Sequence, residues 1–149
     1  MILPITLTIA GAAALLNIWL ARRVGQMRVA HKVSIGDGGN EALIARMRAQ
    51  ANFIEYTPFV LILIGLIELA QGSDIWLWIV GVVYILGRIA HGFGMDRPRP
   101  DPLKLRTIGT VVTGLILLGL ALYAIALPYL HREPARVTYA SAAYEASLT

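Results

Sequence analysis

Hydrophobic residues run through this chain in four long segments that are separated by shorter polar connections, and the segments cover residues 2–21, 53–70, 75–93 and 108–130. A helix needs roughly 20 apolar residues to cross a hydrocarbon core of about 30 Å, and each segment approaches that length. The pattern predicts an all-α integral membrane protein with a four-transmembrane-helix bundle over residues 1–130. The remaining residues, 131–149, lack a hydrophobic period and are predicted to form a polar, flexible tail.

The second helix is predicted to extend well beyond its apolar core. Asn40 follows a glycine-rich turn and is a suitable N-cap, so the helix should begin there and end near Ala70. It would then be about 45 Å long and would project beyond the bilayer. An apolar stripe should pack these first turns on other helices, and it consists of Leu43, Ile44, Met47, Ala51 and Ile54.

Composition and charge support a membrane location and define a topology. Of the 149 residues, 57% are hydrophobic and 15% charged, which is far more apolar than a soluble domain of this size. The first apolar segment lacks the positive region of a secretory signal, so we interpret it as a retained helix. Basic residues cluster after the first span and after the third, at Arg22, Arg23, Arg28 and Lys32 and then at Arg97, Arg99, Lys104 and Arg106. The positive-inside rule then places both termini away from the cytoplasm.

These features also narrow the chemistry. The net charge of +4 is explained by topology, so we expect no nucleic-acid partner. The chain has no cysteine and only three scattered histidines, so we expect no metal site. Any thiol chemistry must use a thiol that a ligand brings.

A polar line lies where the second apolar segment begins. Arg48, Asn52 and Glu55 are spaced i, i+4 and i+7, which places them within about 60° of arc on one helix face. A charge at membrane depth costs about 2.5 to 3.5 kcal/mol even on a lenient scale, so this face needs a partner or a function. One interpretation is structural, with Glu55 paired to Arg88 or Arg48 to hold helices together.

The other interpretation of these charges is a binding site. Arg88 and His91 share a face of the third span, and Arg106 with Thr107 opens the fourth. Arginines bind carboxylates, Glu55 can accept an amino group, and Asn52 can bond amides. Together these side chains fit a small, multiply charged, peptide-like ligand.

The same residues carry a resemblance to a known family. RAQANFIEYTPF, GRIAHGFG and the later LRT resemble sequence blocks of the MAPEG family, the membrane-associated proteins in eicosanoid and glutathione metabolism. GDGG followed by NFIEYTPF is most similar to the bacterial subgroup, which resembles microsomal glutathione transferase. The resemblance implies a homotrimer in a bacterial inner membrane, with glutathione as co-substrate bound between neighbouring subunits near the cytoplasmic side.

The resemblance also implies roles for individual residues. Those for binding glutathione are Arg28, Arg48, Asn52, Glu55, Arg88 and His91. Arg106 and Thr107 stand where the family has its thiol-activating arginine and an adjacent hydroxyl residue, and these two would be catalytic. The sequence departs from the eicosanoid enzymes at Met95 and Thr110, where some members have tyrosines, and at Ala51, where a further arginine can occur.

Three functional hypotheses follow. The first is a glutathione-dependent transferase or peroxidase that acts on lipophilic electrophiles or lipid hydroperoxides, which reach it from the membrane lipid. The second is a non-catalytic protein of the same fold that binds lipid or another small anionic ligand. The third is a structural role, in which the line from Arg48 to Glu55 fastens the trimer.

Overall fold

Four helices account for nearly all of the chain that the structure describes. The structure is a computed structural model, and it describes residues 2–96 and 104–130. The helices are α1 (Pro4–His31), α2 (Glu41–Gln71), α3 (Ile75–Gly94) and α4 (Leu105–Leu130). All four are long and apolar enough to cross a membrane, which confirms the predicted spans. The expected flexible tail lies outside the described residues.

The ends of the helices follow from local sequence. The side chain of Asn40 accepts a hydrogen bond from the Leu43 N–H at 2.9 Å, so its predicted role as N-cap of α2 is confirmed. The preceding turn uses glycine at 36, 38 and 39 with positive φ angles, which glycine adopts without strain. α1 continues past its apolar part to His31, and Lys32 ends it in the left-handed conformation. At about 42 and 46 Å, α1 and α2 both exceed the hydrocarbon core.

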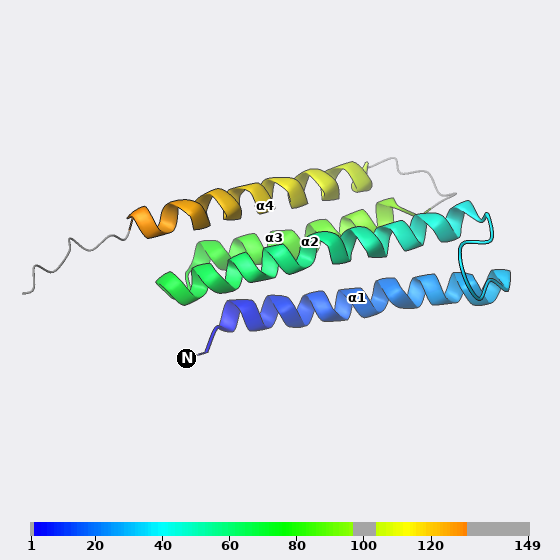
Figure 1. Cartoon of the computed structure of the whole chain (residues 1–149), viewed down its shortest axis with the longest axis horizontal. Helices are drawn as coiled ribbons and strands as arrows, with labels where there is room; N and C mark the ends of the chain where they lie inside the picture. The colour runs from blue at the N-terminus through cyan, green and yellow to red at the C-terminus, as the bar shows by residue number, and fades with distance from the viewer. Residues whose placement is uncertain (1, 97–103, 131–149) are drawn as a thin grey trace, which may run out of the picture.

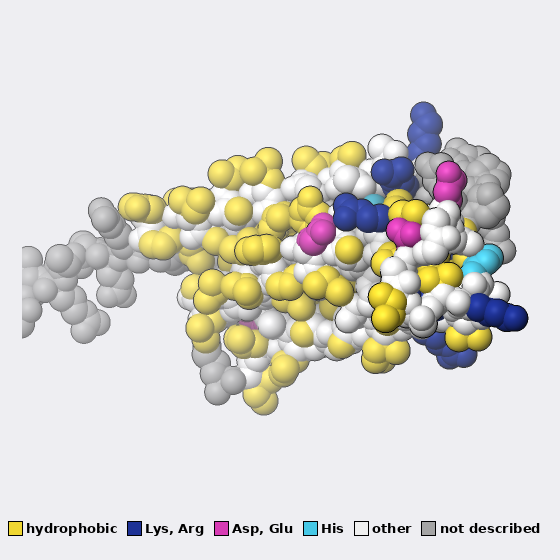
Figure 2. Space-filling view, turned by 45° about the vertical axis from the view of Figure 1, so that its right-hand side comes forward, with side chains coloured by type: hydrophobic (Ala, Val, Ile, Leu, Met, Phe, Trp, Pro, Cys, Tyr) yellow, Lys and Arg dark blue, Asp and Glu magenta, His cyan; other side chains and the backbone are white. Residues whose placement is uncertain are grey.

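The helices lie side by side, with α1 and α4 on opposite flanks (Figure 1). No Cα atom of α1 lies within 8 Å of α4 among the described residues, whereas every other pair of helices is in contact. One apolar cluster fills the bundle toward the N-terminus of α1 and includes Ile5, Ile64, Leu77 and Leu120. A second cluster, nearer the other end, joins α1 and α2 around Phe53. Most of the basic side chains lie at this second end of the bundle, which we call the charged end (Figure 2).

The predicted stripe on the first turns of α2 is only partly correct. Leu43 is fully buried, but Ile44 and Ile54 are 37% and 51% exposed. Ala45, Ala49 and Phe53 take the buried positions instead. Two small residues let α1 approach α2 closely, so the buried face is set by alanines that a search for large apolar residues overlooks.

Glycine allows α3 and α4 to approach even more closely. A Cβ atom on Gly109 would lie 2.5 Å from the Gly87 carbonyl oxygen and 2.6 Å from the Cβ of His91. Small residues at such crossings are typical of helix packing in membranes, where van der Waals contact replaces the hydrophobic effect. The GRIAHGFG segment therefore lies directly against the first turns of α4.

A buried carboxylate that the sequence analysis overlooked holds the end opposite the charged end. Glu68 of α2 is fully buried and accepts hydrogen bonds from the N–H groups of Ile5 and Thr6, at 2.9 and 2.8 Å. It also accepts bonds from the hydroxyls of Thr6 and Ser73, at 2.6 and 2.7 Å. The first N–H groups of a helix have no partner within the helix, and an anion there is favoured by the helix dipole. Glu68 thus caps α1 from a neighbouring helix.

We expect Glu68→Ala to lower the free energy of unfolding by about 1 to 3 kcal/mol, because buried donors lose a charged acceptor. Reversible unfolding of the detergent-solubilised protein, followed by circular dichroism, measures this change. The matched control is Asp74→Asn, which alters an exposed carboxylate near the same end that caps no helix through its side chain. Equal losses in both variants would contradict the capping role.

Candidate functional site

The predicted polar line of α2 lies on the outer surface of the subunit. Arg48 and Glu55 are exposed and Asn52 is half-buried, and we call these three residues the α2 polar face. Apolar neighbours surround it, since Ile54 and Phe59 are 51% and 61% exposed. Figure 2 shows acidic and basic side chains close together on this surface, between the charged end and the apolar flank. A charged face in an apolar setting is the kind of surface that another subunit or a ligand covers.

The expected pairing of Glu55 within the chain does not form. Among the described residues Glu55 makes no ion pair with Arg88 or with Arg48. Arg48 points outward on the same surface, and Arg88 is only 2% exposed. The described residues therefore do not support the interpretation in which Glu55 pairs with Arg48 or Arg88 within one chain.

Arg88 and His91 lie in the interior of the subunit and not on the α2 polar face. The Arg88 guanidinium donates to the Thr113 hydroxyl at 3.3 Å and lies 5.7 Å from the centre of the Phe53 ring. His91 is 4% exposed, and its Nδ1 lies 3.3 Å from both the Arg106 carbonyl oxygen and the Thr110 hydroxyl. Arg88 Nε and His91 Nε2 have no hydrogen-bond partner among the described residues. The eight predicted site residues thus divide into an outer group and this inner pair.

The first turn of α4 contacts the inner pair through its backbone and presents its side chains on the outside. Arg106 and Thr107 have exposed side chains, while the Arg106 backbone contacts α3. A Cβ atom on Gly94 would lie 2.1 Å from the Arg106 nitrogen, so only glycine permits this approach. The Arg106 carbonyl also accepts a bond from the Thr110 hydroxyl at 2.9 Å. His91, inside the bundle, therefore contacts the backbone of Arg106, whose side chain is exposed on the outside.

Arg28 lies where α1 meets the beginning of α2. Its guanidinium donates to the Ser34 carbonyl at 3.4 Å and contacts the Met47 sulfur at 3.6 Å. Because Met47 immediately precedes Arg48, Arg28 lies near the Arg48 end of the α2 polar face. Its half-buried side chain is restrained before any ligand arrives.

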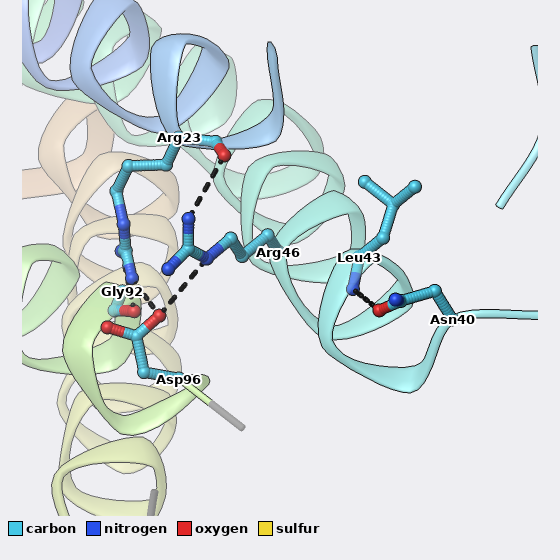
Figure 3. A network of polar contacts seen from close by, with 6 residues as sticks. All are labelled: Arg23, Asn40, Leu43, Arg46, Gly92 and Asp96. Atoms are coloured by element: carbon cyan, nitrogen blue, oxygen red, sulfur yellow. Dashed lines mark hydrogen bonds and ion pairs between the residues drawn. The ribbon is translucent and has the colours of Figure 1, made fainter. Parts of the chain in front are cut away.

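Sequence reasoning missed a second ionic cluster at the charged end. Asp96, just after α3, pairs with Arg23 of α1 and with Arg46 of α2 (Figure 3). Arg23 had been interpreted as part of the topology signal, and Asp96 had no assigned role. The spacing of Trp19 and Arg23, four residues apart on a helix, was the available signal, because it lets the guanidinium stack on the indole.

No group of three or more metal-binding side chains occurs in the described ranges. The described residues thus define a four-helix membrane protein in which most exposed charges lie toward the charged end and the α2 polar face lies on the surface of the bundle.

The chain belongs to the MAPEG family, because the model of that family matches residues 6–126. It is similar to the inner membrane protein YecN of Escherichia coli strain K12 and to its counterpart in strain CFT073 of serotype O6:H1. Identity to each is 32% over 83 residues, which cover 55% of this chain. The same alignment spans 63% of the length of each relative.

The two buried arginines should respond differently to replacement by methionine. Arg23→Met leaves the Gly92 carbonyl without this donor and Asp96 with only the longer contact to Arg46, and it should cost about 2 to 4 kcal/mol of unfolding free energy. Arg88→Met removes a cation that faces no carboxylate, so without ligand it should change stability by less than about 1 kcal/mol. Parallel unfolding in detergent compares the two. A larger loss for Arg88→Met would show that its interior contacts are worth more than the ion pairs of Arg23.

Proposed function

We propose that this protein is a membrane-bound glutathione transferase or peroxidase that attacks lipophilic electrophiles or lipid hydroperoxides. One observation carries the proposal: the α2 polar face presents one arginine charge and one glutamate charge, with an amide between them, on an otherwise apolar flank. Glutathione has two carboxylates, one amino group and two amides, so its charges complement this face. Family membership supports the same assignment.

In this proposal the binding roles follow from charge. Arg48 and Arg28 hold carboxylates through charge-assisted hydrogen bonds, and Glu55 holds the amino group. Asn52 both donates to and accepts from an amide. Arg88 and His91 support the site from inside, since His91 contacts the Arg106 backbone and Arg88 lies one turn before His91.

Arg106 and Thr107 provide the chemistry. A thiol of ordinary pKa, about 8.5, is mostly protonated at neutral pH, whereas its thiolate is the nucleophile. The Arg106 guanidinium and the Thr107 hydroxyl stabilise that anion. The sulfur then forms a bond to the electrophilic carbon, and the leaving group departs with its electron pair and takes up a proton. With a hydroperoxide, the thiolate sulfur attacks the terminal oxygen, so that an S–O bond forms as the O–O bond breaks, which gives a sulfenic acid and, after protonation, an alcohol. The thiol of a second glutathione then attacks the sulfenic sulfur and yields the disulfide and water.

A homotrimer in the inner membrane, with both termini away from the cytoplasm, completes the proposal. Packing against a neighbouring subunit removes the α2 polar face from lipid, where its exposed charges are costly. The name of the similar E. coli protein supports an inner-membrane location. The charged end then faces the cytoplasm, where glutathione is at hand, while apolar substrates enter from the bilayer.

A second candidate is a non-catalytic protein that binds lipid or another small anionic ligand at the same face. The burial of Arg88 and His91 favours it, because two residues expected to touch glutathione point into the subunit. Binding of an anionic lipid headgroup in place of glutathione, without any turnover of electrophiles, distinguishes this candidate.

Arg106→Ala should abolish thiolate formation. Ultraviolet absorbance of the thiolate on mixing with glutathione measures it, and losing the adjacent cation should lower the thiolate fraction about 10- to 100-fold. Arg22→Ala is the matched control, because it removes an exposed arginine on the same side of the bundle. If the unaltered protein gives no thiolate at saturating glutathione, the proposed function is wrong.

Glu55→Gln separates ligand binding from trimer fastening. We expect glutathione affinity to fall about 10- to 100-fold, as the loss of a charge-assisted hydrogen bond requires, while the trimer persists. Calorimetry and size-exclusion chromatography with light scattering measure the two effects, and Glu41→Gln on the same helix is the control. Dissociation into single subunits would instead support the fastening role.

A further inference from the structure

At the charged end, one carboxylate ties three helices together (Figure 3). Asp96 accepts a hydrogen bond from the Arg23 guanidinium, and its Oδ1 lies 3.4 Å from Arg46 Nε. The Arg46 guanidinium also donates to the Arg23 carbonyl at 3.2 Å, so the two arginines are held together. The side chains of Arg23 and Asp96 are only 10% and 13% exposed, which shields their attraction from solvent. We call these three residues the Asp96 clamp.

The contacts of Arg23 extend beyond Asp96 into the last turn of α3. Arg23 donates to the Gly92 carbonyl at 2.9 Å, and its guanidinium lies 4.4 Å from the centre of the Trp19 ring. The Phe93 ring packs on Trp19 with centres 5.1 Å apart. A Cβ atom on Gly92 would lie 2.9 Å from the Trp19 indole, so the α3 backbone at Gly92 packs directly on that side chain.

This last turn of α3 also sets the position of the Arg106 backbone. Gly94 contacts the Arg106 backbone directly, and His91 Nδ1 lies 3.3 Å from the Arg106 carbonyl oxygen. Among the described residues no Cα atom of α4 lies within 8 Å of α1, and α4 packs on α3 and α2. A shift of the last turn of α3 therefore displaces the Arg106 backbone.

We propose that Asp96 is a positioning residue, which sets the place of Arg106 by holding the last turn of α3 between Arg23 and Arg46. The inference rests on the proposed function, in which Arg106 stabilises a thiolate. Electrostatic attraction falls with distance, and moving a cation from about 4 to about 6 Å from an anion in a partly screened site changes the thiolate ratio roughly tenfold. A small displacement of α4 is therefore enough to weaken the chemistry.

The first test needs no ligand. In full-length protein in lipid nanodiscs, amide hydrogen exchange is measured at the first turn of α4, where the Ile108 N–H bonds to the Lys104 carbonyl at 2.9 Å. Asp96→Asn should speed exchange there about tenfold, since a turn that loses its anchor opens more often. Asp37→Asn, which removes an exposed carboxylate on the same side of the bundle, should leave it unchanged. Equal exchange in all three proteins would overturn the proposal.

The second test uses glutathione and measures the thiol pKa separately from the glutathione affinity, because general destabilisation would not raise the pKa while leaving the affinity nearly unchanged. Asp96→Asn should change glutathione affinity less than about threefold but raise the apparent pKa of the bound thiol by about one unit, which lowers the thiolate fraction tenfold. Asp96→Glu, which retains the charge, should restore the pKa. Arg46→Gln weakens the same clamp more gently and should shift the pKa in the same direction, so a failure of Asp96→Asn to fold does not end the test.

The outcomes are distinguishable. An unshifted thiol pKa in both Asp96→Asn and Arg46→Gln, with thiolate still formed, would refute the positioning role and leave the proposed function intact. If the unaltered protein forms no thiolate, the proposed function falls. The exchange measurement then still decides whether Asp96 holds α4.

Discussion

The cost of a charge in an apolar environment governs this structure, and the bundle meets it in four different ways. Glu68 is covered completely and satisfied by the N-terminus of another helix. Asp96 is paired with arginines from two helices. Arg88 is enclosed with little more than a hydroxyl and an aromatic ring. The α2 polar face is left exposed on the outside of the bundle, although exposed charge is costly where lipid surrounds it.

The first two solutions act as fasteners at opposite ends of the bundle. Glu68 joins the end of α2 to the beginning of α1. The Asp96 clamp joins the later part of α1 and the early part of α2 to the end of α3. Between them the helices pack through small residues, and the crossing of Gly87 and Gly109 brings α3 against α4. Because membrane helices gain little from hydrophobic burial, such polar fasteners and close contacts carry much of the specificity of the fold. The Arg106 backbone of the proposed site lies against the last turn of α3, which the clamp holds.

Hydrophobic runs and helical periodicity were sufficient to predict the four spans and the common face of Arg48, Asn52 and Glu55, and the glycine-rich turn before Asn40 indicated the cap. It could not predict which neighbour each face meets, because that depends on how helices far apart in sequence approach one another. Arg88 and His91 illustrate this limit: their spacing placed them on one face, but only the packing of α4 shows that the face is internal. Asp96 gave no periodic signal, since it follows the last turn of α3, and Glu68 was hidden within an apolar run.

The division between inner and outer residues gives the proposed site a layered construction. Outer side chains meet the ligand, and inner ones hold the backbone from which the outer ones project. Thr110 and Met95 fit this arrangement. The Thr110 hydroxyl contacts both His91 and the Arg106 carbonyl, while Met95 packs with the apolar cluster around Phe53. Where some relatives of the eicosanoid group place tyrosines, this chain therefore uses one residue to brace the first turn of α4 and the other to fill the core. In the proposed function, charges from α2 hold most of the ligand, and the reactivity of a bound thiol depends on how firmly α3 holds Arg106.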